Sequence, residues 1–278
     1  PLLRPQHPPP SRRHPLHSST HCLQPLHRPR LTFRVLTPHP AYDTQNRSVS
    51  QLPREDCRAV NLTFLATTMA INVLFGAATV GVFSWMGASN WGLLALVDWP
   101  VWAELLVAVV VLDLVAQYTV HYLLHMFPPF WRLHQVHHSD THVDVTTGTR
   151  HHPLDFVVRE CFALLAVFIT GAPVSFYVFY RILTVFFTYM THANVALPLW
   201  ADRAISLLFI SPNMHKFHHH DVAPWTDSNF GNMLSVWDRL FGTFVYGDVD
   251  QIRYGLDITD PTRSDDLGYQ MKLPFRPK

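Results

Sequence analysis

Residues 59–97 read AVNLTFLATTMAINVLFGAATVGVFSWMGASNWGLLALV, a run of 39 positions without one charged side chain. A helix needs about 20 apolar residues to cross the hydrocarbon core of a bilayer. The run therefore predicts a membrane-spanning helix over 61–86, which ends at the small and polar residues 87–90. Charged residues make up only 15% of the chain, against about 25% in ordinary soluble domains. An integral membrane protein is therefore expected.

Three more apolar segments follow the first one. The segment 101–126 contains Asp113 and stops at Pro128-Pro129, because proline interrupts a helix. Residues 161–201 carry a single charge, Arg181. A Gly-Ala-Pro turn at 171–173 separates two apolar segments in this region, 155–171 and 174–194, and the first is only just long enough to span. The predicted fold is all-α and polytopic, with four transmembrane helices in two hairpins and a cytoplasmic, histidine-rich helical cap.

Charge placement predicts the orientation of these helices. Lysine and arginine favour the cytoplasmic side, and neither occurs at 88–100 or 171–173. Both termini and the loop 127–154 are therefore expected to be cytoplasmic, at a bacterial inner membrane or the endoplasmic reticulum. The expected domains are an arm over 1–58, a membrane domain over 59–250 and a polar tail over 251–278.

The arm has the composition of a disordered segment. Residues 1–40 contain ten prolines and six histidines but no acidic residue, and such a segment buries too little apolar surface to fold. It is either a targeting segment or a wrongly assigned start. Its arginines give it a positive charge, yet it lacks the pattern of a nucleic-acid-binding module, so no nucleic-acid partner is expected.

The remaining thirteen histidines all fall on the predicted cytoplasmic side. Two lie four residues apart at the end of the second span, in HYLLH at 121–125, so both leave one helix face. The motif His-x-x-His-His occurs twice, at 134–138 and 215–219, and His192 ends the last span. On a helical turn each motif can present three ring nitrogens to a metal pair. This distribution predicts one shared metal site.

The number and type of these side chains limit the metal chemistry. Neutral imidazole suits iron, copper, nickel and zinc, and nine or ten histidines exceed the coordination number of one ion. Two redox ions beside a bilayer favour oxygen activation, because unactivated lipid C–H bonds require a strong oxidant. Zinc-dependent hydrolysis and non-catalytic metal binding or transport are the alternatives. Hydrolysis needs fewer ligands, whereas transport places polar groups at mid-bilayer.

The ordered series of motifs resembles the fatty acid hydroxylase/sterol desaturase superfamily, most closely its bacterial sterol desaturase branch. The resemblance covers residues 65–247 and rests on HYLLH (121–125), WRLHQVHHSD (131–140), DVTT (144–147), RHHP (150–153), HAN (192–194), NMHKFHH (213–219), DSNFG (227–231) and WDRLFGT (237–243). It implies a membrane-bound di-iron oxidoreductase that hydroxylates or desaturates a lipid with O2. Electrons would come from a separate donor such as cytochrome b5, ferredoxin or a reductase.

The resemblance also implies a set of ligands for two iron ions, which zinc can replace in purified samples. These ligands are His121, His125, His134, His137, His138, His192, His215, His218 and His219. His152 matches the His-Pro position of the family and is implied either as a further ligand or as a residue that contacts one. His142 and His220 do not fit the repeated pattern and are expected to have no role at the metal site or to face solvent. Three nearby acids, Asp140, Asp144 and Asp227, are expected to be helix caps or loop charges, with orientation of an imidazole as the alternative.

Overall fold

The protein is helical in the computed structural model, which describes residues 57–276 except 196, 223–224 and 248–251. Within these ranges the only β-type pairing is an isolated bridge between Phe209 and Leu234, so the prediction of a helical fold is confirmed. The predicted arm lies outside the described residues except for Cys57 and Arg58, which begin the first helix.

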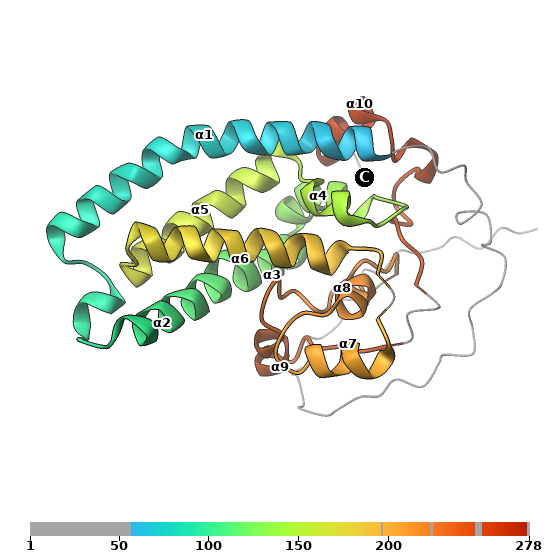
Figure 1. The fold of residues 1–278 in the computed structure, drawn as a ribbon. Helices are drawn as coiled ribbons and strands as arrows, with labels where there is room; N and C mark the ends of the chain where they lie inside the picture. The colour runs from blue at the N-terminus through green and yellow to red at the C-terminus, as the bar shows by residue number, and fades with distance from the viewer. Residues whose placement is uncertain (1–56, 196, 223–224, 248–251, 277–278) are drawn as a thin grey trace, which may run out of the picture. The chain divides into compact units, whose positions relative to one another are not determined.

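Long helices form a bundle in which they lie side by side (Figure 1). They are α1 (Cys57–Ser89), α2 (Val101–Asp113) with its continuations η4 (Leu114–Thr119) and α3 (Val120–Met126), α5 (Pro153–Thr170) and α6 (Val174–His192). Small buried residues such as Ala108, Ala116 and Ala166 let these helices approach closely. The buried ring of Tyr180 fills the space between them.

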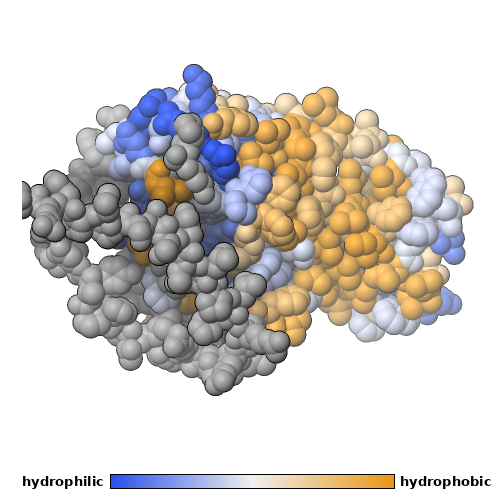
Figure 2. Space-filling model, turned by 180° about the vertical axis from the view of Figure 1, so that it is seen from behind, coloured by the Kyte–Doolittle hydropathy of each residue, from blue (hydrophilic) through white to orange (hydrophobic). Residues whose placement is uncertain are grey.

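Three candidate membrane spans are long and apolar enough to cross a bilayer: Cys57–Leu96, Val101–Met126 and Val174–His192. Figure 2 shows the matching surface, an apolar band over the bundle with more hydrophilic residues at either end. Exposed tryptophans, among them Trp85, Trp91 and Trp102, lie near the end of the bundle away from the cap, as is typical of a membrane interface. These features are those of a membrane protein.

The fourth predicted span is a helix, α5, but it carries Asp155, Arg159 and Glu160. Asp155 is fully buried and Glu160 is 4% exposed, because α5 packs against α1 and α2 and turns these charges into the bundle. The count of four crossings and the cytoplasmic position of the cap therefore stay predictions.

The second span changes its helical pitch just before the first histidine pair. Residues Leu114–Thr119 form a π-helical segment, η4, between α2 and α3. Such segments are rare and are frequent at functional sites. Each residue of an α-helix turns it by about 100°, and the wider turn changes that angle over six residues. The π-helical segment thus sets the direction in which His121 and His125 leave the helix.

The opposite end of the bundle is closed by two glycines in contact. Gly171 has φ +66° and ends α5, and a Cβ added there would lie 2.1 Å from the Trp91 carbonyl oxygen. Gly92 has φ +109°, and its own added Cβ would lie 2.4 Å from the Gly171 Cα. The Trp91 indole donates a hydrogen bond of 2.9 Å to the Phe168 carbonyl. Only glycine allows the two turns to meet this closely.

Short helices form the cap at the other end of the bundle (Figure 1). Two of them carry the repeated histidine motifs, α4 (Pro128–His138) and α8 (Pro212–His218), and both start at a proline that suits a first helical turn. The other short elements are η3 (Leu93–Leu96), η5 (Val145–Thr149), α7 (Leu199–Ile205), α9 (Val236–Phe241), η7 (Pro261–Arg263), α10 (Leu267–Lys272) and η8 (Leu273–Phe275), of which η3 lies at the opposite end.

A buried arginine joins the cap to the bundle and to the C-terminal segment. Arg150 is fully buried and donates hydrogen bonds to the Val136 carbonyl (2.9 Å), Asn61 Oδ1 (3.0 Å) and the Ser264 carbonyl (2.6 Å). Val136 is on α4, Asn61 is on α1 and Ser264 precedes α10. One guanidinium therefore fixes three segments beside the histidines of α4.

Candidate metal centre

Nine buried histidines meet where the cap contacts the bundle, and they form two groups. Within each group the candidate ligand nitrogens all lie within 4.8 Å of one another. The five-histidine group comprises His121, His125, His134, His138 and His218, and the four-histidine group comprises His137, His192, His215 and His219. The structure thus brings together nine of the ten histidines that were expected at the metal site.

Helical geometry explains how each His-x-x-His-His motif serves both groups. On α4, His134 and His138 are four residues apart and enter the five-histidine group, whereas His137 enters the other group. The α8 motif has the opposite assignment. Its first and last histidines, His215 and His219, belong to the four-histidine group, whereas His218 belongs to the five-histidine group. Positions i+3 and i+4 are about 100° apart around a helix. Each motif can therefore bridge two neighbouring centres.

The four-histidine group has the spacing of ligands around one ion. His192 Nε2 lies 3.2 Å from His137 Nε2, 3.0 Å from His215 Nε2 and 3.2 Å from His219 Nε2. One ring nitrogen has either a single proton or a single lone pair, so these three contacts cannot all be hydrogen bonds. Nitrogens that bind one metal at about 2.0–2.1 Å lie about 3 Å apart. The nitrogens of this group therefore have the spacing that one bound metal ion would require.

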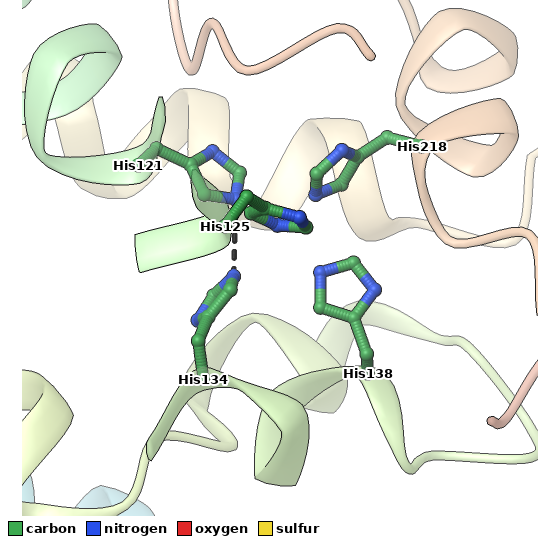
Figure 3. Close-up of side chains that lie close together, drawn as sticks. All are labelled: His121, His125, His134, His138 and His218. Carbon is green, nitrogen blue, oxygen red and sulfur yellow. Dashed lines mark hydrogen bonds between the residues drawn. The ribbon is translucent and has the colours of Figure 1, made fainter. Parts of the chain in front are cut away.

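The five-histidine group leaves several buried nitrogens unpaired (Figure 3). His121 Nε2 and His134 Nε2 are 3.1 Å apart. Among the described residues, His125 Nε2, His218 Nε2 and both ring nitrogens of His138 have no hydrogen-bond partner. A buried polar atom without a partner costs about 1–3 kcal/mol. A bound ion would remove this cost for the nitrogens that point into the group.

Carbonyl oxygens outside the two groups determine which ring nitrogen faces inward. His121 Nδ1 lies 2.8 Å from the Phe230 carbonyl, His192 Nδ1 lies 2.7 Å from the Thr188 carbonyl, and His218 Nδ1 lies 2.6 Å from the Ser228 carbonyl. A carbonyl only accepts, so Nδ1 carries the proton in each ring. The Nε2 lone pair then points into the group. Many metal-binding histidines are arranged in this way, with the other ring nitrogen donating to a carbonyl.

Burial keeps the cap histidines neutral. Desolvation lowers the pKa of His134 to about 3. Desolvation, and next to it the repulsion of neighbouring imidazoles, also lowers the pKa well below its ordinary value for His137, His138, His215, His218 and His219. Metal ions bind the neutral imidazole. These side chains are therefore in the form that can hold a metal near neutral pH.

His152, which was expected to be a ligand or to contact one, belongs to neither group. Its Nδ1 accepts a hydrogen bond of 3.2 Å from the Leu154 amide and so caps α5. Its Nε2 lies 3.3 Å from the Met271 carbonyl. Both ring nitrogens thus have partners away from the two groups, since the start of α5 at Pro153 turns His152 toward the C-terminal segment.

The neighbouring His151, which the sequence interpretation passed over, does lie beside the centre. Its ring stacks on His137 with a centroid distance of 4.8 Å, and its Nδ1 lies 2.8 Å from Asp155 Oδ2. The other oxygen of Asp155 is 3.6 Å from His134 Nδ1. The sequence does contain a signal for this contact, because His151 and Asp155 are four residues apart across the start of α5. Asp155 thus links His151 to the five-histidine group.

Other expected roles are settled by single contacts. Asp227 Oδ1 lies 3.2 Å from His125 Nδ1, so it orients an imidazole. Asp144 caps η5 by accepting from the Thr146 amide, and Asp140 accepts from the Thr147 hydroxyl at 2.8 Å. His220 belongs to neither histidine group, as one of its two expected roles required, but it is buried and does not face solvent. It pairs with Asp221 at 2.8 Å because the chain after α8 folds back over it.

A cavity of about 210 Å³ extends from the histidines into the bundle. One face each of α1, α5 and α6 lines it, and the α6 face runs from Arg181 to His192, about 16 Å at 1.5 Å per residue. Its lining also includes His121 and His137, one from each group. The two histidine groups are thus open to a space between apolar helices.

Comparison with known proteins gives a consistent result. The model of the family described as "Fatty acid hydroxylase" matches residues 105–243, half of the chain. Ornithine lipid hydroxylase OlsE of Rhizobium tropici is 29% identical over 147 residues, which cover 53% of this chain and 43% of that protein. Alkylglycerol monooxygenase of Caenorhabditis elegans is 27% identical over 46% of this chain and 24% of its own length, and the Homo sapiens enzyme is 29% identical over 50% and 30%.

The chain thus matches less than half the length of each of these relatives. No solved structure is significantly similar to it.

Proposed function

The chain belongs to the fatty acid hydroxylase family, and from this premise we propose that it is a membrane-bound, two-metal oxidoreductase that uses O2 to hydroxylate or desaturate a lipid. The observation that carries the proposal is the pair of buried histidine groups open to one intramembrane cavity. The lipid hydroxylases and monooxygenases among its relatives support the class of reaction.

The ligand chemistry fits two iron ions. In this proposal the five-histidine group holds one ion and the four-histidine group holds the other. Imidazole nitrogen is a good ligand for iron, and neither group includes a thiolate of the kind common in structural zinc sites. When bound, the two irons would supply the redox chemistry that activates O2.

The residues of the chain supply binding, orientation and exclusion of water. The carbonyls of Phe230, Thr188 and Ser228 orient three imidazoles, and burial of all nine histidines keeps bulk water away. The cavity holds the C–H bond to be oxidised beside both groups. Insertion of one oxygen atom from O2 releases the other as water and consumes two electrons and two protons. We propose that a cytochrome b5, a ferredoxin or a reductase delivers the electrons from the cytoplasmic side.

Metal analysis and product analysis test the proposal together. The protein is purified in detergent from cells grown with iron, its metals are counted by mass spectrometry, and ¹⁸O2 incorporation into extracted lipids is measured with a chemical reductant. About two irons per chain and reductant-dependent ¹⁸O incorporation are expected. A protein that oxidises no lipid after iron is supplied, whether it holds zinc alone or a single ion per chain, would overturn the proposal in favour of hydrolysis or metal storage.

A matched variant controls for general damage to α8. His220 directly follows the second histidine motif and is buried, but it belongs to neither group. His220→Ala is expected to keep both irons and most of the activity. His137→Ala is expected to abolish turnover while the protein stays in the membrane.

A further inference from the structure

A charged pair in the cavity has no part in the oxidation chemistry. Arg181 Nη1 donates to Glu160 Oε1 at 2.8 Å, and Arg181 Nη2 donates to Asn72 Oδ1 at 3.1 Å. The three residues come from α6, α5 and α1, and all three line the cavity. The pair is therefore accessible to whatever the cavity binds.

Such a pair is expensive where it lies. Ionisable residues inside a membrane span are rare and usually mark a functional site. An ion pair in an apolar interior can often be replaced by apolar residues of similar volume without loss of stability. Glu160 has a side chain that is only 5% exposed, so its charge depends on Arg181. Packing of the bundle alone does not require these charges.

The wall between this pair and the histidines is largely apolar, with residues such as Leu65 and Val185, but polar side chains interrupt it. Thr68 on α1, Thr188 on α6 and Gln117 on η4 line the same cavity. The Thr68 hydroxyl is buried and has no hydrogen-bond partner among the described residues. A tunnel that holds only an acyl chain gains nothing from such groups, because each unpaired polar group beside a hydrocarbon chain loses its hydration. These three side chains offer hydrogen bonds at intervals between the charged pair and the histidines.

We propose that the cavity binds the head group of the lipid substrate, and that this head group is zwitterionic. Arg181 would bind its anionic group and Glu160 its cationic group. The ion pair between Arg181 and Glu160 would then be replaced by one ion pair from each residue to the ligand. A carboxylate with an ammonium, as in an amino-acid head group, or a phosphate with an ammonium satisfies this site. A neutral glycerol head group does not. The inference rests on the proposed function, because it assigns a substrate class to the same site.

Binding of defined amphiphiles to the full-length protein tests the inference without turnover. The probes are N-dodecanoyl-ornithine, which carries one carboxylate and one ammonium, dodecanoyl lysophosphatidylethanolamine, and neutral dodecylglycerol. Retention of each lipid is measured by native mass spectrometry and by equilibrium dialysis in detergent. At least one zwitterionic probe is expected to bind 10-fold or more tightly than dodecylglycerol, and the stronger of the two identifies the anionic group. Equal binding of all three would overturn the inference.

Two variants link the preference to the pair. The double variant Arg181→Met/Glu160→Gln removes both charges at similar volume, so neither charge is left buried alone. It is expected to lose about 10- to 100-fold in affinity for the zwitterion, as for loss of charge-assisted hydrogen bonds, while dodecylglycerol binding is unchanged. Arg263→Met is the control, because Arg263 pairs with Asp266 at 2.6 Å on the surface. A double variant that keeps the full preference would contradict the proposed site.

A third variant separates this inference from the proposed function. His218→Ala is expected to abolish lipid oxidation but to bind the zwitterion as the unmodified protein does. Oxidation of dodecylglycerol with no zwitterion preference would overturn the inference and leave the function standing. A zwitterion preference in a protein that contains no redox metal would overturn the function and leave the inference standing.

Discussion

Two adjacent histidines, His218 and His219, are predicted to affect different metal ions when each is replaced by alanine. His218 belongs to the five-histidine group and His219 to the four-histidine group. A four-ligand site binds zinc with about 10–16 kcal/mol, so one of four ligands contributes about 3 kcal/mol, more than a hundredfold in Kd. His219→Ala leaves three imidazoles in the four-histidine group, so a loss of this size in metal affinity is expected. His218→Ala leaves four imidazoles in the five-histidine group, so its loss of metal affinity is expected to be smaller.

Chelator titration measures this difference. Each variant is titrated with a chelator of known affinity, and the metal that remains is counted per chain. His219→Ala is expected to lose one ion at about a hundredfold lower chelator than the unmodified protein and to keep the second. His218→Ala should lose its ion only at an intermediate concentration. The loss of both ions together from His219→Ala, or of neither, would refute the division of the motif between two centres.

Three further predictions concern stability. Gly171→Ala is expected to lower the free energy of unfolding by about 1–3 kcal/mol, since the added Cβ would meet the Trp91 carbonyl; an unchanged Tm in detergent would contradict it. Arg150→Met should lower it by about 3–5 kcal/mol, as for other broken buried networks, and near-normal urea unfolding would contradict this. Burial raises the pKa of Asp238 to about 6, above its unfolded value near 4, so its contribution to stability falls as pH rises from 4 to 6. Asp238→Asn should remove about 3 kcal/mol of that fall, and unfolding curves of the two proteins that keep the same pH dependence would disprove it.

The apolar spans and the histidine motifs could be predicted because each depends on local sequence. An uncharged run as long as 59–97 predicts a long apolar helix, and α1 confirms that helix. The charges of α5 were harder to interpret, since Asp155 and Glu160 satisfy their charges with partners from other segments, His151 and Arg181. Whether the charged side chains of such a helix face the bundle interior depends on the helices packed against it, which the local sequence does not specify.

The choice between His151 and His152 could not be made from sequence. The two are adjacent at the start of α5, and a shift of one residue in that start would exchange their directions. The tertiary contact that decides it is the Met271 carbonyl, more than 100 residues away along the chain. The cavity charges were visible as exceptions in apolar helices, but the pairing of Arg181 with Glu160 required the relative rotation of two helices.

The π-helical turn at Leu114–Thr119 places one surplus residue in the second span. If the same residues wound as an ordinary α-helix, everything beyond them would rotate by about 100°. The span would keep its 26 residues, enough to cross a bilayer, so the protein would insert as before. His121 and His125, however, would leave the five-histidine group. A substitution that favours the α-helical turn is thus a short evolutionary route from an active to an inactive membrane protein of this architecture.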